Sequence, residues 1–321
     1  MLSAGMFGRL APHPRDTHPR LVIDDYFLPT LPAPPLVIDY ASQVASWPMY
    51  GNDTIGDCTC AAVGHMVQAW TEYANTELTV SQQSIIQLYS AVSGYNPVTG
   101  QNDNGANLQD VLGYWQKNGI PGTNDKILLF AEIADRSNLT LIQQCLWIFG
   151  TVYLGMDVPQ SAVTQFGQGL PWTVSASQAN IVGQHAIPLQ NFDTNNPNPI
   201  EIVTWAALQR MSTDFWNKYI AQTQDGEAWI IISSDWLTSA GYTIAAAGAL
   251  DLYQLGQDFT AITGQPSPIP VPPAPPVPPP TPPPVPPGPT PPPVPAAPPG
   301  PPDLSAWWNS VVAWISAGGK K

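Results

Sequence analysis

The chain has 321 residues, of which only 10% are charged, and its formal net charge at pH 7 is -13. Nucleic-acid surfaces need clustered lysine and arginine, so this composition argues against a nucleic-acid partner. Three cysteines are too few, and odd in number, for a disulfide framework. The sequence shows neither a secretory h-region nor 18 consecutive apolar residues, so we expect a soluble protein and leave its localisation open.

Residues 1–38 are expected to form an extended N-terminal arm, because seven prolines in this stretch remove backbone donors and disfavour helix. Residues 39–264 have the mixture of apolar and polar residues that is typical of one folded domain. Its first half shows helical periodicity in four stretches: from Cys58 to about Tyr73, "SQQSIIQLYSAVSGY" with Ser81 as N-cap, "NLQDVLGYWQKNGI" and "NLTLIQQCLWIFG".

The second half of the domain is rich in short, β-branched apolar runs bounded by turn residues. They are "TVYLGMDV", "HAIPLQNF", "IEIVTW" and "AWIIIS", followed by one more helical pattern, "AGALDLYQLGQDFTAI". Pro188 falls inside the second run, so that strand should be bulged or lie at a sheet edge. Helices followed by strands predict an α+β domain.

The C-terminal part of the sequence is expected to be a linker followed by a helix. Residues 266–302 hold 24 of the 39 prolines without a collagen period, so we expect a Pro-rich linker over 265–302 in the polyproline II conformation. Residues 303–321 carry apolar residues at helical spacing, including three tryptophans. This Trp-rich amphipathic helix should dock on a protein groove or a membrane surface.

The first predicted helix begins with a cysteine whose position favours a reactive thiol. Cys58 follows Gly56 at the helix start, where unpaired backbone amides and the helix dipole lower a thiol pKa. Asp57 is a natural N-cap, although its charge next to a thiolate would oppose ionisation. Cys58 is therefore a candidate nucleophile.

Of the four histidines, His185 is the best candidate for a general base. His13 and His18 lie in the arm, and His65 is about 10 Å from Cys58 along the helix, too far for a hydrogen bond. His185 opens a strand-like run and could project toward the helix start.

A metal site is the main rival use of the cysteines. Cys58, Cys60, Cys145 and a histidine could supply four ligands, but C-x-C lacks the usual spacer and Cys145 lies in an apolar helix pattern. We therefore expect no metal and no cofactor, with Cys60 and Cys145 as small core residues.

The stretch "GNDTIGDCTCAAVGH" resembles the active-site region of the papain-like cysteine peptidases. The signature of that family is C-G-[SA]-C-[WY], and its histidine lies roughly 130 to 150 residues downstream, close to the spacing of Cys58 and His185. The resemblance implies that Cys58 is the nucleophile, His185 the base and Asn52 the oxyanion-hole residue. The asparagine that orients the family's imidazole falls at Val203 or Thr204, and of these only Thr204 can form a hydrogen bond.

Further weak matches keep the family's order along residues 38–235. "DNGANLQDVLGYWQKNGI" is similar to the family's Asn-Gly-Gly stretch, which implies that Asn104 and Gly105 contact an extended substrate, together with Trp205 from "EIVTWAALQ". The implied fold is a two-lobed domain with a helical N-terminal lobe and a β-rich C-terminal lobe. The implied activity is hydrolysis of peptide bonds in a peptide or protein substrate.

Two other functions are compatible with the sequence. Because the family's asparagine and the Trp after the nucleophile are both missing, the chain could be a weakened or inactive relative, a non-catalytic binding or structural module such as one displayed on a virus particle or cell surface. A thiol amidase acting on cell-wall peptides also uses Cys-then-His order. It usually needs a second histidine soon after the first, and this chain has no fifth histidine.

Overall fold

The computed structural model describes residues 7–29, 31–238 and 250–269. The predicted helix at 303–321 and the Pro-rich linker after residue 269 lie outside these residues, as do the first three residues of the last predicted helix. The division of the chain at residues 38, 264 and 302 stays a prediction. In the part of the chain that is described, no helix is both long and apolar enough to cross a membrane.

The four helices predicted in the first half of the domain are confirmed, as is the described part of the last predicted helix, and several shorter helices lie between them. Ser81 caps the second predicted helix, since its side chain accepts a hydrogen bond from the Ser84 N–H. The bounds are α1 (Cys58–Tyr73), α2 (Gln82–Ser93), α3 (Leu108–Asn118), α4 (Leu139–Phe149), α5 (Gln160–Gly167), α6 (Thr213–Trp216), α7 (Ser234–Thr238) and α9 (Leu252–Thr263), with short helical turns η2 (Ile23–Tyr26) and η3 (Asn217–Ala221).

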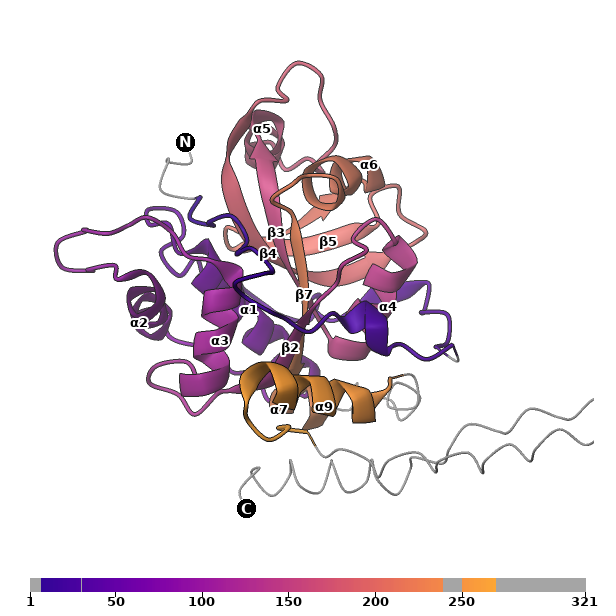
Figure 1. Ribbon diagram of the computed structural model, residues 1–321. Helices are drawn as coiled ribbons and strands as arrows, with labels where there is room; N and C mark the ends of the chain where they lie inside the picture. Colours follow the sequence, from indigo (N-terminus) through magenta and orange to yellow (C-terminus); the bar gives the residue numbers. More distant parts are fainter. Residues whose placement is uncertain (1–6, 30, 239–249, 270–321) are drawn as a thin grey trace, which may run out of the picture.

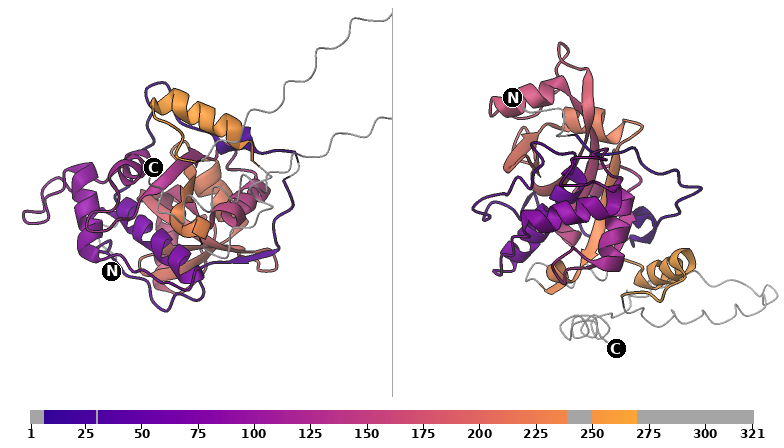
Figure 2. Two further views of the ribbon diagram at one scale, coloured as in Figure 1. Left: turned by 90° about the horizontal axis from the view of Figure 1, so that it is seen from below. Right: turned by 90° about the vertical axis from the view of Figure 1, so that its left-hand side faces the viewer.

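One antiparallel sheet organises the described part of the chain. Its strands are β1 (Val37–Asp39), β2 (Ile127–Glu132), β3 (Val152–Pro159), β4 (Ile181–Asp193), β5 (Ile200–Thr204), β6 (Ala207–Met211) and β7 (Glu227–Ser233). They lie in the order β2-β7-β3-β4-β5-β6, and β1 pairs with β4. Figures 1 and 2 show α1, α2 and α3 gathered on one side of this sheet. The predicted α+β class is confirmed.

Helix α1 runs through the centre of the molecule. Nearly every side chain along it is buried, which explains why its sequence is mostly apolar or small, with a charge only near its end. Cys60 in this helix and Cys145 in α4 are fully buried in the core, as the sequence predicts. The N-terminus of α1 packs against β4, so Cys58 lies beside the strand that carries His185.

Strand β4 is central, and Pro188 lies within it opposite Tyr153 of β3. The expectation that Pro188 puts this strand at a sheet edge is wrong, because β4 has β3 and β1 on one side and β5 on the other. The alternative, a bulge, agrees with a register shift between Leu189 and Asn191 in the pairing with β5. A proline that cannot donate to the ladder is accommodated next to such an irregularity.

The N-terminal arm is extended but contributes to the core. Leu21, Ile23 and Tyr26 are buried, and β1 adds a short strand at the arm's end. Arg15 and Arg20 both pair with the buried carboxylate of Glu132 in β2. The arm is thus packed along the domain, between the helices and the strands (Figure 1).

Candidate active site

Cys58 is the first residue of α1, at the end of a glycine-containing turn. Gly51 adopts a φ of 97°, which allows the tight turn that leads into the helix. The Asp57 side chain does not cap the helix, in contrast to the sequence prediction, although its carbonyl accepts from the N–H of Cys60 at 2.8 Å. Burial raises the pKa of Asp57 well above its usual range, and the charge of Asp57 raises the pKa of Cys58, in the direction that the sequence predicts.

His185 lies in β4 with its ring oriented by β5. Its Nε2 is 2.8 Å from the hydroxyl oxygen of Thr204, and both residues are buried. Its Nδ1 has no hydrogen-bond partner among the described residues. Val203, the other candidate for the orienting position, points to the opposite face and packs with Trp47 in a separate apolar cluster.

Trp205 covers the His185–Thr204 pair. Its ring stacks on the imidazole with centroids 4.9 Å apart and an interplanar angle of 25°. Trp205 and Ala206 have φ values of 45° and 63° and connect the paired residues Thr204 and Ala207, which makes them a two-residue turn of type I′. Type I′ turns usually contain Asn-Gly, which adopts positive φ at low cost. Trp205 and Ala206 therefore hold a strained backbone conformation at the position where the indole stacks on the imidazole.

The sulfur of Cys58 lies next to the backbone of β4 at the residue after His185. Burial raises the pKa of Cys58 to about 11, against the opposing effect of backbone N–H groups of Gly8 and Ala186 that donate toward the sulfur. Burial likewise lowers the pKa of His185 to about 3. In this arrangement both groups are uncharged at neutral pH.

The remaining residues predicted for the site differ in whether they are buried near Cys58 and His185. Asn52 is buried, and its side-chain amide donates to the Ile55 carbonyl at 3.5 Å, beside Asp57. Asn104 is exposed, whereas Gly105 is buried with a φ of 83° and donates its N–H to the Tyr89 hydroxyl at 2.9 Å. The structure therefore brings Gly105, but not the Asn104 side chain, into the buried surroundings of the site.

The N-terminal arm covers the site, which the sequence analysis did not predict. A Cβ added at Gly8 would be 1.7 Å from the carbonyl oxygen of Gly56, and one added at Gly105 would be 2.1 Å from the carbonyl oxygen of Gly8. Phe7 packs edge-on against His185 and Trp205, with ring centroids 6.1 and 6.0 Å away. Residues 7 and 8 thus fill the space directly above Cys58 and His185.

The geometry provides the parts of a thiol nucleophile with an imidazole base. A cysteine at a helix N-terminus can be ionised by a neighbouring imidazole whose other nitrogen is held by a hydroxyl. For ligation of a metal, the described residues offer no group of three His, Cys, Asp or Glu side chains.

Comparisons with known proteins identify the fold. No protein-family model and no curated protein sequence matches the chain. Among solved structures, xylellain, a cysteine protease from Xylella fastidiosa, is similar at 16% identity and a TM-score of 0.55, over 72% of this chain and 97% of xylellain. Procathepsin B S9 from Trypanosoma congolense is similar at 10% identity and a TM-score of 0.50, over 72% of this chain and 87% of its own. The chain has the papain-like fold.

Proposed function

We propose that this papain-fold chain is a cysteine peptidase that hydrolyses peptide bonds through Cys58 and His185. The observation that supports it most is the orientation of His185, whose Nε2 faces the Thr204 hydroxyl at 2.8 Å and whose Nδ1 is left without a partner among the described residues. An imidazole held in this way has one nitrogen available for the proton of a neighbouring thiol.

The proposed reaction proceeds in two steps. Cys58 Sγ attacks the peptide carbonyl carbon while its proton passes to His185 Nδ1, and the Cys58 backbone N–H together with Asn52 stabilises the oxyanion. His185 then gives the proton to the leaving amine, and a thioester remains on Cys58. A water molecule, deprotonated by His185, hydrolyses this thioester and restores the thiol.

Hydrolysis and thiol reactivity test this function together. Cys58→Ala and His185→Asn should each abolish cleavage of fluorogenic peptides, whereas Cys60→Ala, which alters a buried cysteine outside the proposed chemistry, should retain it. With the arm displaced by Gly8→Ala, whose new Cβ would meet the Gly56 backbone, iodoacetamide near neutral pH should modify Cys58 faster than Cys60 or Cys145, by mass spectrometry of the adduct. Labelling of Cys58 at the rate of an ordinary thiol in denatured protein would contradict an activated nucleophile.

A non-catalytic binding or structural module is the second candidate. Its supporting observation is that the N-terminal arm buries the pair and that Cys58 and His185 are both uncharged in this state. The two functions differ in what happens when the arm is displaced. A peptidase gains a reactive Cys58 thiol and hydrolytic activity, whereas a non-catalytic module gains neither.

A further inference from the structure

Residues 7–10 of the N-terminal arm, which we call the covering segment, bind the domain as an extended peptide would. Leu10 donates its backbone N–H to the Ala106 carbonyl at 2.9 Å, and Ala106 donates to the Gly8 carbonyl at 2.7 Å. On the other side, the N–H of Arg9 donates to the Gln184 carbonyl at 3.4 Å. Main-chain bonds on both sides fix an extended chain independently of its sequence, and side-chain sites then select among sequences.

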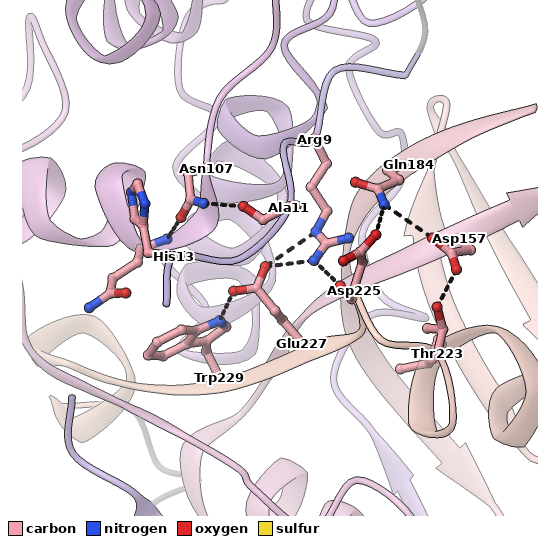
Figure 3. Close-up of polar contacts among 12 residues, drawn as sticks. Arg9, Ala11, His13, Asn107, Asp157, Gln184, Thr223, Asp225, Glu227 and Trp229 are labelled. Atoms are coloured by element: carbon pink, nitrogen blue, oxygen red, sulfur yellow. Dashed lines mark hydrogen bonds and ion pairs between the residues drawn. The ribbon is translucent and has the colours of Figure 1, made fainter. Parts of the chain in front are cut away.

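One such side-chain site holds Arg9. The guanidinium group is fully buried and donates to the Glu227 carboxylate twice, from Nη2 at 2.8 Å and from Nε at 3.2 Å. Nη2 also donates to the backbone carbonyl of Asp225. Figure 3 shows the side chain pointing away from its own segment into this acidic position at the start of β7.

The surroundings of the guanidinium group suit it in shape as well as charge. Gly155 of β3 lies opposite Glu227 in register, and a Cβ at Gly155 would be only 2.2 Å from Arg9 Nε. The indole N–H of Trp229 donates to the other carboxylate oxygen of Glu227 at 3.4 Å and holds it in place. We call Gly155, Asp225 and Glu227 the arginine site.

A buried carboxylate without a cation is costly. Burial raises the pKa of Glu227, and Arg9 opposes that rise through its charge and its hydrogen bonds. When the arm leaves, this carboxylate is without its cation, so a peptide that brings another guanidinium is favoured over one that brings an apolar side chain. Arginine fits better than lysine because its planar fork can contact the carboxylate and the carbonyl at once.

We infer that the arginine site accepts an arginine side chain of an extended peptide ligand, so that peptides containing arginine next to the reacting bond are the substrate class of this site. The position follows from the covering segment, in which Arg9 adjoins the glycine that lies against Gly56 beside Cys58. The word substrate rests on the peptidase function proposed above, whereas the binding of arginine does not.

Binding is tested with a small cation that needs only the side-chain position. In full-length Arg9→Ala protein, millimolar N-ethylguanidinium should raise the melting temperature by about 2 °C or more, and the neutral isostere N-ethylurea should not. The matched control is Arg9→Ala with Glu227→Gln, which should respond to neither. An equal response to both compounds, or a response to the cation that persists in the double variant, overturns the inference.

The comparison of N-ethylguanidinium with N-ethylurea can also be made if the Arg9→Ala protein does not fold without a ligand. The expected result is then recovery of native near-ultraviolet circular dichroism with N-ethylguanidinium and not with N-ethylurea. Arg9→Gln, which keeps an amide donor toward Glu227, is the second variant for the same measurement. Absence of any difference between the two compounds in both variants contradicts the arginine site.

Hydrolysis separates this inference from the function on which it depends. In the Arg9→Ala protein, kcat/KM for a peptide with arginine next to the cleaved bond should exceed that for the citrulline peptide by about tenfold or more, and Glu227→Gln should remove the preference. Cleavage without this preference contradicts the inference alone. No cleavage of any peptide, with Cys58 unreactive, contradicts the peptidase function and leaves the guanidinium result to decide on arginine binding.

Discussion

The hydroxyl of Thr204 lies 2.8 Å from Nε2 of His185, where it holds the ring beneath the Trp205 indole. A hydroxyl is a weaker partner for an imidazolium than an amide carbonyl, but it fixes the same nitrogen. In the proposed mechanism this contact orients the base, so peptidase activity should depend on Thr204.

Replacing Thr204 tests that dependence. Thr204→Val keeps the shape and removes the hydroxyl, and kcat/KM for peptide hydrolysis should fall roughly tenfold to a hundredfold, the effect of losing a hydrogen bond to a charged group. Thr204→Ser keeps the hydroxyl and should retain most activity. The pH–rate profile of Cys58 alkylation should shift in the Val variant and not in the Ser variant. Equal profiles would mean that Thr204 is only structural.

Displacing the arm should expose Cys58. In Gly8→Ala the new Cβ would meet the Gly56 backbone, which can yield only if the segment lifts. An overpacking cost of about 1 to 3 kcal/mol predicts that iodoacetamide modifies Cys58 roughly tenfold faster than in the wild type, as measured by mass spectrometry. Gly113→Ala in α3 is the matched control, since a Cβ there meets nothing within 4 Å. Identical rates in the two variants would show that the arm does not limit access.

The strained turn after β5 predicts a stabilising glycine. Ala206 has a φ of 63°, and a left-handed conformation costs an L-residue about 1 kcal/mol that glycine does not incur. Ala206→Gly should therefore raise the free energy of unfolding by about 0.5 to 1 kcal/mol in urea titrations. The same substitution at exposed Ala91 in helix α2 should lower it by a similar amount. A loss of stability at both positions would contradict the assigned turn.

Acid should destabilise the fold through His65. Its Nε2–H donates to the Pro48 carbonyl at 2.8 Å, and burial lowers its pKa from 6.5 to about 4. Below about pH 6.5 the unfolded chain takes up a proton that the folded protein does not, so stability is complete above that pH and is lost as the pH falls toward 4.

The magnitude of this effect is measurable by comparison with His65→Gln. Between pH 7.5 and 4.5 the wild type should lose about 2 to 3 kcal/mol more unfolding free energy than the variant, in urea titrations at each pH. His185 has the same sign of effect and is present in both proteins, so the part of its shift that comes from burial, the largest cause, cancels in the difference. Parallel pH profiles would indicate that His65 is not held neutral.

Much of the fold could be predicted because its elements carry strong local signals. Helix α1 begins at Cys58, directly after a glycine turn, and α2 is capped by Ser81, so both starts are visible in the sequence. The strand with His185 is marked by a β-branched run between turn residues. The pairing of Cys58 with His185 across the fold came from the family resemblance, since no local pattern relates residues so far apart.

Other features have no local signal. Strand β6 (Ala207–Met211) was not predicted, because the turn before it is Trp205–Ala206 and lacks the glycine or asparagine that usually marks a hairpin. The prolines predict an extended arm but not the surface on which it packs, and Ile23 is buried because burial of an extended segment depends on the surface it meets. The ion pair of Arg9 with Glu227 links residues 218 positions apart in the sequence, and no spacing rule predicts such a contact.

The contact between Gly8 and Gly56 also determines how a ligand from solution must compete. Because the covering segment belongs to the same chain and is tethered to the core at Leu21, its effective concentration over Cys58 is on the order of millimolar, whatever the protein concentration. A free peptide displaces the segment only when the ratio of its concentration to its dissociation constant exceeds the same ratio for the tethered segment. Cleavage of the exposed stretch between Leu10 and Leu21 would end this advantage, since the released fragment would be diluted to the concentration of the protein itself.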